Sequence, residues 1–449
     1  MKKSDILIWI LLVLLVVPLT AIEIPISIQQ EEIFTKSDKH YDRAALEIAG
    51  CIGGLWSYDR YITRQKWAVI GCKSIEANFK HGFEWDRGEF GMNQILHPYN
   101  GSMYYTAARS NHLSFAESSG YTFLGSLTWE LFMENHFPSA NDMIMTTLGG
   151  VALGEVLYRL ADLNLNVAVS PALHTSKELL SAVISPMYGF NRLINRPKRG
   201  AQYASADLDL TVMLGGNSEQ ISQYYDKLQP HIMAGISLEY NELFQDNQVR
   251  TPFDYFKLDL SVMAYRDNTI PYINLLGHLV GREFSTEHFD ILGGSFLQYD
   301  FTNNKIIKFS TTSIGPGIEI RSKGNDDYEI KFGTHIQGIA LGAISSPYHV
   351  ARMDYNLGPG FAISNTLQIG KRNGIKISLR GSHYQVFNVQ GADGHETISL
   401  ASSSLDIPVY RSLSYSLNYV VYHRKDFYHD YSDLMLYSDT LQTYFTFSL

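Results

Sequence analysis

The sequence predicts an α+β protein in which a helical domain over about residues 40–200 is followed by an antiparallel transmembrane β-barrel of about twelve strands over 201–449. Three observations predict this fold. From about residue 204 apolar and polar residues alternate with period two, which suits a half-buried strand and not a helix. Before that point small residues recur four apart and capping sequences precede apolar runs. Beyond the N-terminal segment no run of about 18 apolar residues occurs, so we do not expect single helices to span a membrane.

The first 21 residues are typical of a secretory signal peptide. Lys2 and Lys3 precede an apolar run from Ile6 to Val17, and Pro18 to Ala21 come before the polar stretch "SIQQEE". An uncleaved anchor is the alternative, but the run is shorter than the roughly 20 residues of a spanning helix. We therefore expect cleavage near Ala21 and a linker over residues 22–39. With no cysteine near that point, we expect no lipoprotein anchor.

The composition narrows the class of protein. The formal charge is −9 and only 18% of residues are charged, so the chain has no basic character that would attract nucleic acid. It contains 29 tyrosines and 23 phenylalanines, an aromatic load that suits membrane interfaces. Two classes remain for such an exported chain: a soluble periplasmic protein or an outer-membrane β-barrel.

Two cysteines are too few for a disulfide framework. Cys51 lies in a run of small apolar residues that is typical of a buried thiol. A single bond between Cys51 and Cys72 stays open as an alternative.

The barrel half is predicted from four clear alternating stretches. They read "ASADLDLTVML" (204–214), "YFKLDLSVM" (255–263), "GIKISLRGSHY" (374–384) and "LSYSLNYVVY" (413–422). In each, apolar side chains face lipid or a core, and polar ones such as Asp209, Asp259 and Arg380 face a wet lumen or solvent.

Turn residues separate the strands and set their number. Predicted turns are Gly215-Gly216-Asn217, Asp267-Asn268, Asn303-Asn304, Gly324-Asn325-Asp326-Asp327, Asn373-Gly374 and Gly391-Ala392-Asp393-Gly394. Counting between turns gives about twelve strands of roughly 9–14 residues, the length that a tilted strand needs to cross a bilayer. We expect the sheet to close, because an open sheet in lipid would expose unpaired edges.

The last stretch, "LQTYFTFSL" (441–449), places Leu441, Thr443, Phe445, Phe447 and Leu449 on one face. It resembles the C-terminal strand of bacterial outer-membrane proteins, which the barrel-assembly machinery reads, although leucine replaces the usual terminal aromatic. A soluble sandwich or lipocalin-like barrel would explain the alternation equally well, but it explains the strand lengths and the aromatic end less well. We therefore predict an outer-membrane location.

The helical half carries signals for close packing. Ala45, Ala49 and Gly53 are spaced four apart, as are Gly150 and Gly154, so each set would present a smooth strip to a neighbouring helix. Capping boxes at Ser114-x-x-Glu117 and Ser139-x-x-Asp142 predict helices over about 114–134, interrupted near Gly120, and 139–160. In this interpretation Glu117 and Asp142 satisfy helix N-termini, and Glu155 forms an i, i+4 ion pair with Arg159.

A polar stretch, "HPYNGSMYYTAARSN" (97–111), stands out within the helical half. Together with nearby carboxylates and serines it supplies the candidate site residues, which are His97, Ser102, Arg109, Ser126, Glu130, Glu134 and Asp142. One hypothesis makes Ser102 or Ser126 a nucleophile, His97 its base, and Glu130 or Asp142 the orienting acid of a lipid- or lipopolysaccharide-modifying hydrolase. The chain has no Gly-x-Ser-x-Gly elbow and no known metal-site spacing, so we expect no cofactor and favour a structural, non-enzymatic role.

The same segment resembles an uncharacterised family of exported Gram-negative proteins, classified as a domain of unknown function. The resemblance rests on "HPYNGSMYYTAARSN", "GSLTWELFMEN", "PSANDMIMTTLGGVALGE" and "SPMYGFNRLI", over about residues 90–200. This chain has Asn100 where a histidine or another polar residue is common in the family, which weakens a two-histidine site here. The resemblance implies an envelope location and no reaction.

Four basic residues, Arg192, Arg196, Lys198 and Arg199, precede the first strand and suit either lipid phosphates or a solvated linker. The leading functional hypothesis is an envelope protein whose helical domain gates or plugs the barrel, or binds lipid or a partner. The expected partners are outer-membrane lipids or lipopolysaccharide and, through the last strand, the barrel-assembly machinery. The alternatives are the hydrolase and a soluble periplasmic binding protein.

Overall fold

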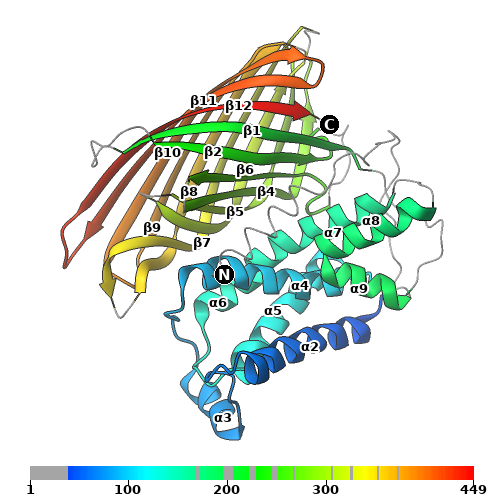
Figure 1. The fold of residues 1–449 in the computed structure, drawn as a ribbon, viewed down its shortest axis with the longest axis vertical. Coiled ribbons are helices and arrows are strands. Elements are labelled where there is room, and N and C mark those ends of the chain that lie inside the picture. The colour runs from blue at the N-terminus through cyan, green and yellow to red at the C-terminus, as the bar shows by residue number, and fades with distance from the viewer. Residues whose placement is uncertain are drawn as a thin grey trace. The chain divides into compact units, whose positions relative to one another are not determined.

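A computed structural model describes residues 39–166, 171–195, 206–221, 229–244, 251–265, 268–304, 307–323, 327–350, 353–371 and 374–448. The predicted signal peptide, its cleavage point and Arg196, Lys198 and Arg199 lie outside these ranges. The chain divides into two compact units, Met1–Ala206 and Asp207–Leu449. The described part of the first unit is helical and that of the second is a β-barrel, which confirms the predicted fold class (Figure 1).

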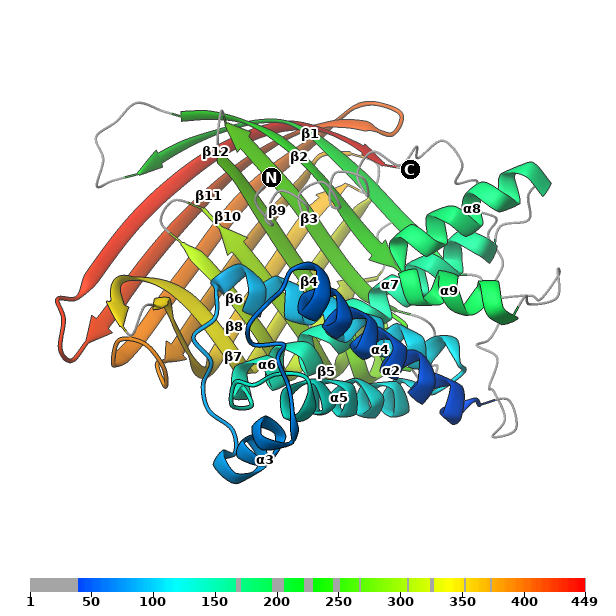
Figure 2. The ribbon, with the colours of Figure 1, turned by 60° about the horizontal axis from the view of Figure 1, so that its bottom comes forward.

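The helical unit contains α2 (Tyr41–Ser57), α3 (Cys72–His81), α4 (His97–Ser110), α5 (Phe115–Phe132), α6 (Ala140–Ile144), α7 (Gly150–Asn166), α8 (Pro171–Ile184) and α9 (Pro186–Asn195), with π-helical turns η3 (Tyr58–Ile62), η4 (Met92–Leu96) and η5 (Met145–Gly149). In Figure 2, α2, α4 and α5 run alongside one another. Ile48 and Ile52 of α2 pack there against Tyr104 and Trp129, so the polar stretch around His97 forms a central helix of this unit.

Helix α5 begins where the sequence predicts. Ser114 Oγ accepts the Glu117 N–H at 3.3 Å, and the Ser114 N–H donates to Glu117 Oε2 at 2.7 Å, so this capping box is confirmed. The predicted interruption near Gly120 is wrong, because the helix continues to Phe132. One glycine costs a helix about 1 kcal/mol, and packing on both sides of it outweighs that cost.

Helices α6 and α7 form one continuous run through η5. This run, Ala140–Leu165, is the one helix among the described residues that is long and apolar enough to cross a membrane. Its most apolar window is 61% buried within the protein, and it carries the buried ion pair of Glu155 and Arg159. Both features are those of a core helix.

Of the two helix-packing strips of small residues that the sequence predicts, the structure contains one. Gly150 and Gly154 pack against α4, as predicted. The prediction of a packing strip on α2 is wrong, because Ala45 and Ala49 are exposed and nothing lies within 4 Å of a Cβ built on Gly53. Helix α2 instead buries Ala44, Glu47, Ile48 and Ile52, and the two isoleucines bury more apolar area there than Ala45 or Ala49 would.

Both cysteines are free thiols. Cys51 is partly buried and lies 3.3 Å from Met187 Sδ, whereas Cys72 is exposed at the start of α3. The disulfide that the sequence left open is therefore not formed.

The barrel contains β1 (Leu208–Ile221), β2 (Gln229–Tyr240), β3 (Phe256–Tyr265), β4 (Asn268–Ser285), β5 (Phe289–Asn303), β6 (Lys308–Ser322), β7 (Tyr328–Val350), β8 (Met353–Lys371), β9 (Lys376–Phe387), β10 (Gly394–Tyr410), β11 (Leu413–Tyr428) and β12 (Leu434–Ser448). Each strand pairs antiparallel with its sequence neighbours, and β1 pairs with β12 to close the sheet (Figure 1). The described strands number twelve, as predicted, but most exceed the predicted length, and β7 reaches 23 residues.

One predicted turn is wrong. Gly215, Gly216 and Asn217 lie within β1, paired with Tyr444, Thr443 and Gln442 of β12. A Cβ on Gly215 would stand 2.1 Å from the carbonyl oxygen of Thr443, so the backbones approach closely at this position. The glycine serves barrel closure and does not mark a turn.

The two faces of the barrel differ in polarity. On β9, Ile377 and Leu379 are about half exposed on the outside, as is Ile375 just before the strand, while Ser378 and Arg380 line the interior. On β12, Leu441, Phe445 and Phe447 are likewise exposed on the predicted outer face. An apolar outer surface over long, tilted, closed strands is the property of a membrane barrel, which overturns the soluble alternative.

Candidate functional site

The histidine of the polar stretch contacts two residues of the α6–η5 segment. His97 Nδ1 lies 3.1 Å from Thr146 Oγ1, and His97 Nε2 lies 3.6 Å from Asp142 Oδ1. Asp142 Oδ1 also accepts from Asn141 Nδ2 at 2.9 Å. Burial raises the pKa of Asp142 and the nearby His97 opposes that rise. His97 therefore ties the first turn of α4 to the helix that begins at Ser139.

Glu130 holds the start of the same helix from outside it. The Ser139 N–H donates to Glu130 Oε2 at 2.8 Å, while Ser139 Oγ accepts the Asp142 N–H at 3.1 Å. The predicted capping box at Ser139 is thus half right, because the acid that receives the Ser139 N–H comes from α5 and not from Asp142. Burial, with the carboxyl groups of Asp142 and Glu134 nearby, raises the pKa of Glu130 well above its ordinary value.

Glu134 lies two residues beyond the end of α5, and its side chain has a different partner from that of Glu130. Its Oε1 accepts from Trp129 Nε1 at 2.6 Å. The amide of Asn78 donates to the carbonyl oxygen of Leu131 at 3.2 Å, which caps the last turn of α5, and to that of Glu134 at 3.1 Å just beyond the helix. Burial raises the pKa of Glu134, and the Trp129 hydrogen bond lowers it in part.

Neither candidate serine meets the histidine. Ser102 Oγ donates to the carbonyl oxygen of Tyr99 at 2.6 Å, within its own helix. Ser126 is 1% exposed, and its hydroxyl has no hydrogen-bond partner among the residues that the structure describes. Among the described residues no hydrogen bond joins either serine to His97, so these three side chains do not form a nucleophile and base.

Arg109 belongs to a second, separate network. Its guanidinium donates to both oxygens of Glu155, from Nε at 2.8 Å and from Nη2 at 3.1 Å, and to the carbonyl oxygen of Leu113 from Nη1 at 2.9 Å. Arg159 Nε and Tyr105 Oη donate to the same carboxylate at 2.9 Å and 2.7 Å. The predicted pair of Glu155 and Arg159 is confirmed, but the larger pairing with Arg109 was not predicted.

The electrostatics of Glu155 follow from its partners. Burial alone would raise the pKa of this fully buried carboxyl group, but Arg109 and Arg159 reverse that effect and lower it. An ionised carboxylate with three donor side chains is stable in a dry interior only as a bonded unit. The network therefore fastens α4 to α7.

The glycines of α4 and α7 explain how the two helices come so close. A Cβ on Gly101 would stand 1.8 Å from the carbonyl oxygen of Thr146, and one on Gly150 would stand 2.6 Å from Gly101 Cα. Gly154 faces Tyr105 in the same way. These contacts give the polar stretch a structural role. Within the described ranges, no three histidine, cysteine or acidic side chains form a group suited to a metal ion.

The barrel interior contains a cavity of about 880 Å³. Its charged lining has nine carboxylates and four cationic side chains, which are Asp207, Asp209, Glu239, Glu242, Asp259, Asp300, Glu319, Glu329 and Asp406 against Lys257, Arg321, Lys331 and Arg380. The rest of the lining includes serines, asparagines, glutamines and tyrosines. The lining therefore holds five more carboxyl groups than cationic side chains.

Two of the lumen carboxylates make dense contacts. Asp259 on β3 accepts from Ser237 Oγ at 2.5 Å and from Arg380 Nη1 on β9 at 3.4 Å. Five strands separate β3 from β9 in both directions around the barrel, so Arg380 reaches across the lumen. Asp300 accepts from Asn274, Gln298, Thr311 and Tyr384.

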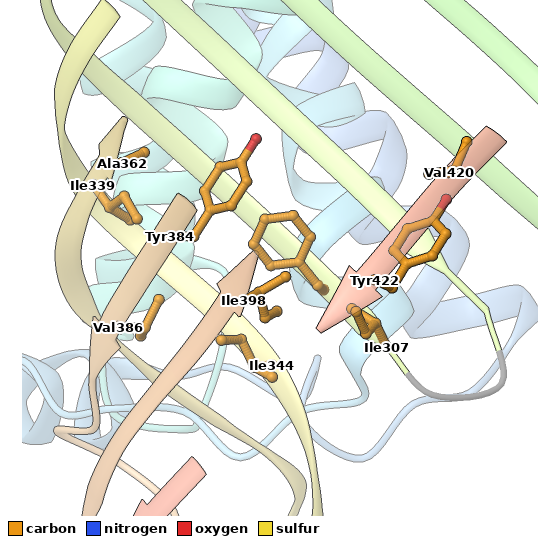
Figure 3. Close-up of a cluster of buried hydrophobic side chains, with 10 residues drawn as sticks. Ile307, Ile339, Ile344, Ala362, Tyr384, Val386, Ile398, Val420 and Tyr422 are labelled. Carbon is orange, nitrogen blue, oxygen red and sulfur yellow. The ribbon is translucent and has the colours of Figure 1, made fainter. Parts of the chain in front are cut away.

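An apolar cluster within the barrel bounds the cavity. We call it the apolar layer, and it comprises Ile307, Phe309, Ile339, Ile344, Ala362, Tyr384, Val386, Ile398, Val420 and Tyr422. Figure 3 shows its labelled side chains converging from several strands. The rings of Phe309 and Tyr384 meet edge to face at 4.8 Å between centroids. Phe309, Tyr384, Val420 and Tyr422 also line the cavity, so the layer forms one of its walls.

A buried ionic group lies beyond the apolar layer, nearer the ends of β10 and β11 that face the turn 388–393. Arg424 Nη2 lies 2.8 Å from Asp426 and 3.7 Å from Glu396. Glu396 also accepts from Asn356 Nδ2 at 2.6 Å and from Tyr428 Oη at 2.7 Å. All five side chains are buried, and none of them lines the cavity.

Several lumen residues lie on the side of the strand that the sequence predicts, although they are not among the candidate site residues. Asp207, Asp209, Lys257, Asp259, Ser378 and Arg380 all fall on the predicted polar side of their strands, and all line the cavity. The sequence signal that could identify this lining is the excess of carboxylates at the inward-facing strand positions. It becomes visible when charge is counted at those positions alone.

A closed antiparallel barrel with an apolar outside and a polar inside defines an outer-membrane β-barrel protein, here joined to an N-terminal helical unit. Residues 82–187 match the family model described as Domain of unknown function (DUF3943), which confirms the resemblance seen in the sequence. No curated protein matches the chain.

Among solved structures the chain is similar to the NanC porin, with 10% identity, 54% of this chain and 100% of that chain covered, and a TM-score of 0.30. It is also similar to the outer-membrane channel DcaP of Acinetobacter baumannii, with 9% identity, 54% and 97% covered, and a TM-score of 0.26. The toluene transporter TodX of Pseudomonas putida shows 9% identity, 54% and 89% covered, and a TM-score of 0.25. The assignment as a barrel rests on the strand pairing described above.

Proposed function

We propose that this outer-membrane barrel admits a small solute that is polar and positively charged into its lumen, and that the apolar layer keeps the barrel closed at rest. The observation that carries the proposal is the cavity of about 880 Å³ with nine carboxylates against four cationic side chains. In a confined, low-dielectric lumen such an excess raises the local concentration of cations and repels anions.

The apolar layer supports the closed resting state. Water and ions cross a narrow apolar constriction poorly, because an ion there loses its hydration without gaining polar partners. The ten side chains of the layer come from β6 to β11 and from the turn before β6, so they meet inside the barrel and not on its outer wall. Passage of a solute would need this layer to part.

Conductance in a planar lipid bilayer tests the proposal. The wild-type chain should show little conductance, and a variant with Phe309→Ala, Tyr384→Ala and Tyr422→Ala should conduct, because it removes three rings from the layer. Ile377→Ala is the matched control, since this residue lies on β9 but faces outward, 51% exposed. An openly conducting wild type, or a folded triple variant that stays closed, would contradict the proposal.

Two expectations from the sequence stay proposals. The gating or plugging by the helical domain is one, and recognition of β12 by the barrel-assembly machinery is the other. The alternating outer face of β12, with Leu441, Phe445 and Phe447, supports the second. The lipid-modifying hydrolase gains no support from the contacts of His97, which go to Thr146 and Asp142.

A further inference from the structure

Three methionines from neighbouring strands form a cluster on the inner face of the barrel. Met213 lies on β1, Met233 on β2 and Met263 on β3, and Tyr444 of β12 packs against them. Met233 and Met263 stand opposite each other in the β2–β3 register. Met213 extends towards β2, since a Cβ on Gly235 would stand 3.0 Å from Met213 Cε. All three methionines line the lumen cavity, and we call them the methionine cluster.

Polar groups lie directly beside the sulfur atoms of this cluster. Asn217 Nδ2 donates to Met263 Sδ, and Gln442 Nε2 donates to the same sulfur at 4.0 Å. Asn217 is 6% exposed, and its Oδ1 has no hydrogen-bond partner among the described residues. His231 stands opposite Asn217 in the β1–β2 register and two residues before Met233, so it shares the inner face. A buried amide oxygen is therefore available next to the thioethers.

A space-filling role does not account for this cluster. Methionine fills irregular gaps in apolar cores, but these three side chains border a cavity whose lining is largely polar. The apolar layer, by contrast, is built from branched and aromatic side chains, and its ten described members include no methionine. Packing alone would also leave the Asn217 Oδ1 atom without a function, since a buried polar atom without a partner is costly.

The chemistry of the thioether indicates what the cluster can bind. Thioether sulfur is a soft, uncharged ligand that selects soft metal ions such as Cu(I), whereas Mg²⁺ and Ca²⁺ prefer oxygen ligands. Three such sulfurs from adjacent strands can surround a single ion. They bring no negative charge of their own, and the excess of carboxylates in the cavity lining balances the charge of the ion.

We propose that the methionine cluster binds a soft monovalent metal ion, Cu(I) or Ag(I), as cargo inside the lumen. This inference names one class of cation for the proposed function, and it rests on that function only for the entry of cations. The lining carboxylates attract the ion, and the thioethers retain it while hard cations pass by. No electron transfer is involved, because the ion keeps the oxidation state in which it arrives.

Competition for Cu(I) between the full chain in detergent and the chelator bathocuproine disulfonate, with ascorbate present, tests the site. Cys51→Ala and Cys72→Ser form the background, because a free thiol would bind Cu(I) by itself. In the cluster variant, leucine replaces all three methionines, which removes the sulfurs and keeps most of the volume. Heat-modifiable migration on a gel first confirms that each barrel is folded.

Met353→Leu is the matched control. Met353 is also buried in the barrel, on β8, and its sulfur also accepts from an amide, that of Gln390 at 3.8 Å. It belongs neither to the methionine cluster nor to the cavity lining. Met233→Leu alone leaves two thioethers and should give an intermediate affinity, so the test does not depend on the folding of the triple variant.

The background chain should bind a single Cu(I), and excess Mg²⁺ should not displace it. The cluster variant should bind Cu(I) at least about tenfold more weakly, since losing even a supporting partner of a metal ligand weakens binding by about that factor. Met353→Leu should match the background. X-ray absorption at the copper edge should show sulfur neighbours that disappear in the cluster variant. Equal affinity in the background and the cluster variant, or copper with only nitrogen and oxygen neighbours, would overturn the proposal.

The charge selectivity of a barrel opened at the apolar layer separates this inference from the proposed function. If leucine at the cluster leaves Cu(I) affinity unchanged while the opened barrel still prefers potassium over chloride, the metal site is refuted and the proposed function stands. If Cu(I) binding depends on the cluster but the opened barrel prefers chloride, the metal site stands and the cation-favouring lumen is refuted.

Discussion

Removing the guanidinium of Arg109 tests whether the polar stretch is structural. In Arg109→Ala the buried carboxylate of Glu155 loses two charge-assisted hydrogen bonds, at 2.8 Å and 3.1 Å, and keeps those from Arg159 and Tyr105. Breaking a buried ion pair on one side costs about 3–5 kcal/mol. Because Arg159 and Tyr105 still donate to Glu155, we expect the free energy of local opening of α4 from α7 to fall by about 3 kcal/mol, the lower end of that range.

Hydrogen exchange of the full chain in detergent measures this cost. At about 1.4 kcal/mol per tenfold change, a loss of about 3 kcal/mol speeds exchange through local opening roughly a hundredfold. Peptides from α4 and α7 should show the effect, and peptides from β10 and β11 should serve as an internal control in the other unit. Adding Glu155→Gln to Arg109→Ala should recover part of the protection, because it removes the uncompensated charge.

The pH dependence supplies a second readout. Arg109 and Arg159 lower the pKa of Glu155 against the opposing effect of burial. A carboxyl group whose pKa is lower in the folded state stabilises the fold above its unfolded pKa and loses that contribution as pH falls through the folded value. In Arg109→Ala the folded-state pKa of Glu155 moves up towards its unfolded value, so the loss of α4 protection on acidification should be smaller than in the wild type. Exchange within about fivefold of wild type at neutral pH would refute the structural assignment.

Substitutions at three other places in the chain have equally definite expected outcomes. Gly101→Val should separate α4 from α7 and lower the yield of folded protein, because its side chain would overlap the Thr146 carbonyl, whereas Gly120→Ala, with nothing within 4 Å of the new Cβ, should be tolerated in the same expression assay. Ser102→Ala and Ser126→Ala should leave any lipid turnover by the purified protein at wild-type level, and a loss of turnover without loss of fold would revive the hydrolase. Phe445→Ser with Phe447→Ser should reduce barrel assembly severalfold, measured as the heat-modifiable fraction in isolated outer membranes, while Thr440→Ser on the same strand should not.

The sequence predicted the barrel because period-two alternation is a local signal that each strand carries by itself. Lys257 and Asp259 could be placed inside on that basis alone. The contact of Asp259 with Arg380 could not, because it depends on which strands lie opposite one another after closure. The turn predicted at Gly215 is wrong for the same reason, since only the close approach of Thr443 on β12 shows why glycine is required.

The helical unit shows the same limit. The pair of Glu155 and Arg159 is one turn apart and was predicted, whereas Arg109 comes from another helix and was not. Glu130 was read as a candidate acid, yet it caps Ser139 of a different helix. A sequence does not distinguish a polar residue that binds a substrate from one that pairs with another side chain. The contacts between distant segments in the fold distinguish them.

The charge selectivity of the opened barrel tests the central claim most directly. In the variant with Phe309→Ala, Tyr384→Ala and Tyr422→Ala, the reversal potential is measured across a tenfold gradient of potassium chloride. The acidic lumen predicts a potential with the sign of the potassium equilibrium potential, and adding Asp209→Asn, Glu239→Gln and Asp406→Asn should move it towards zero. A reversal potential with the sign of the chloride equilibrium potential, or one that these three substitutions leave unchanged, would contradict a cation-favouring lumen.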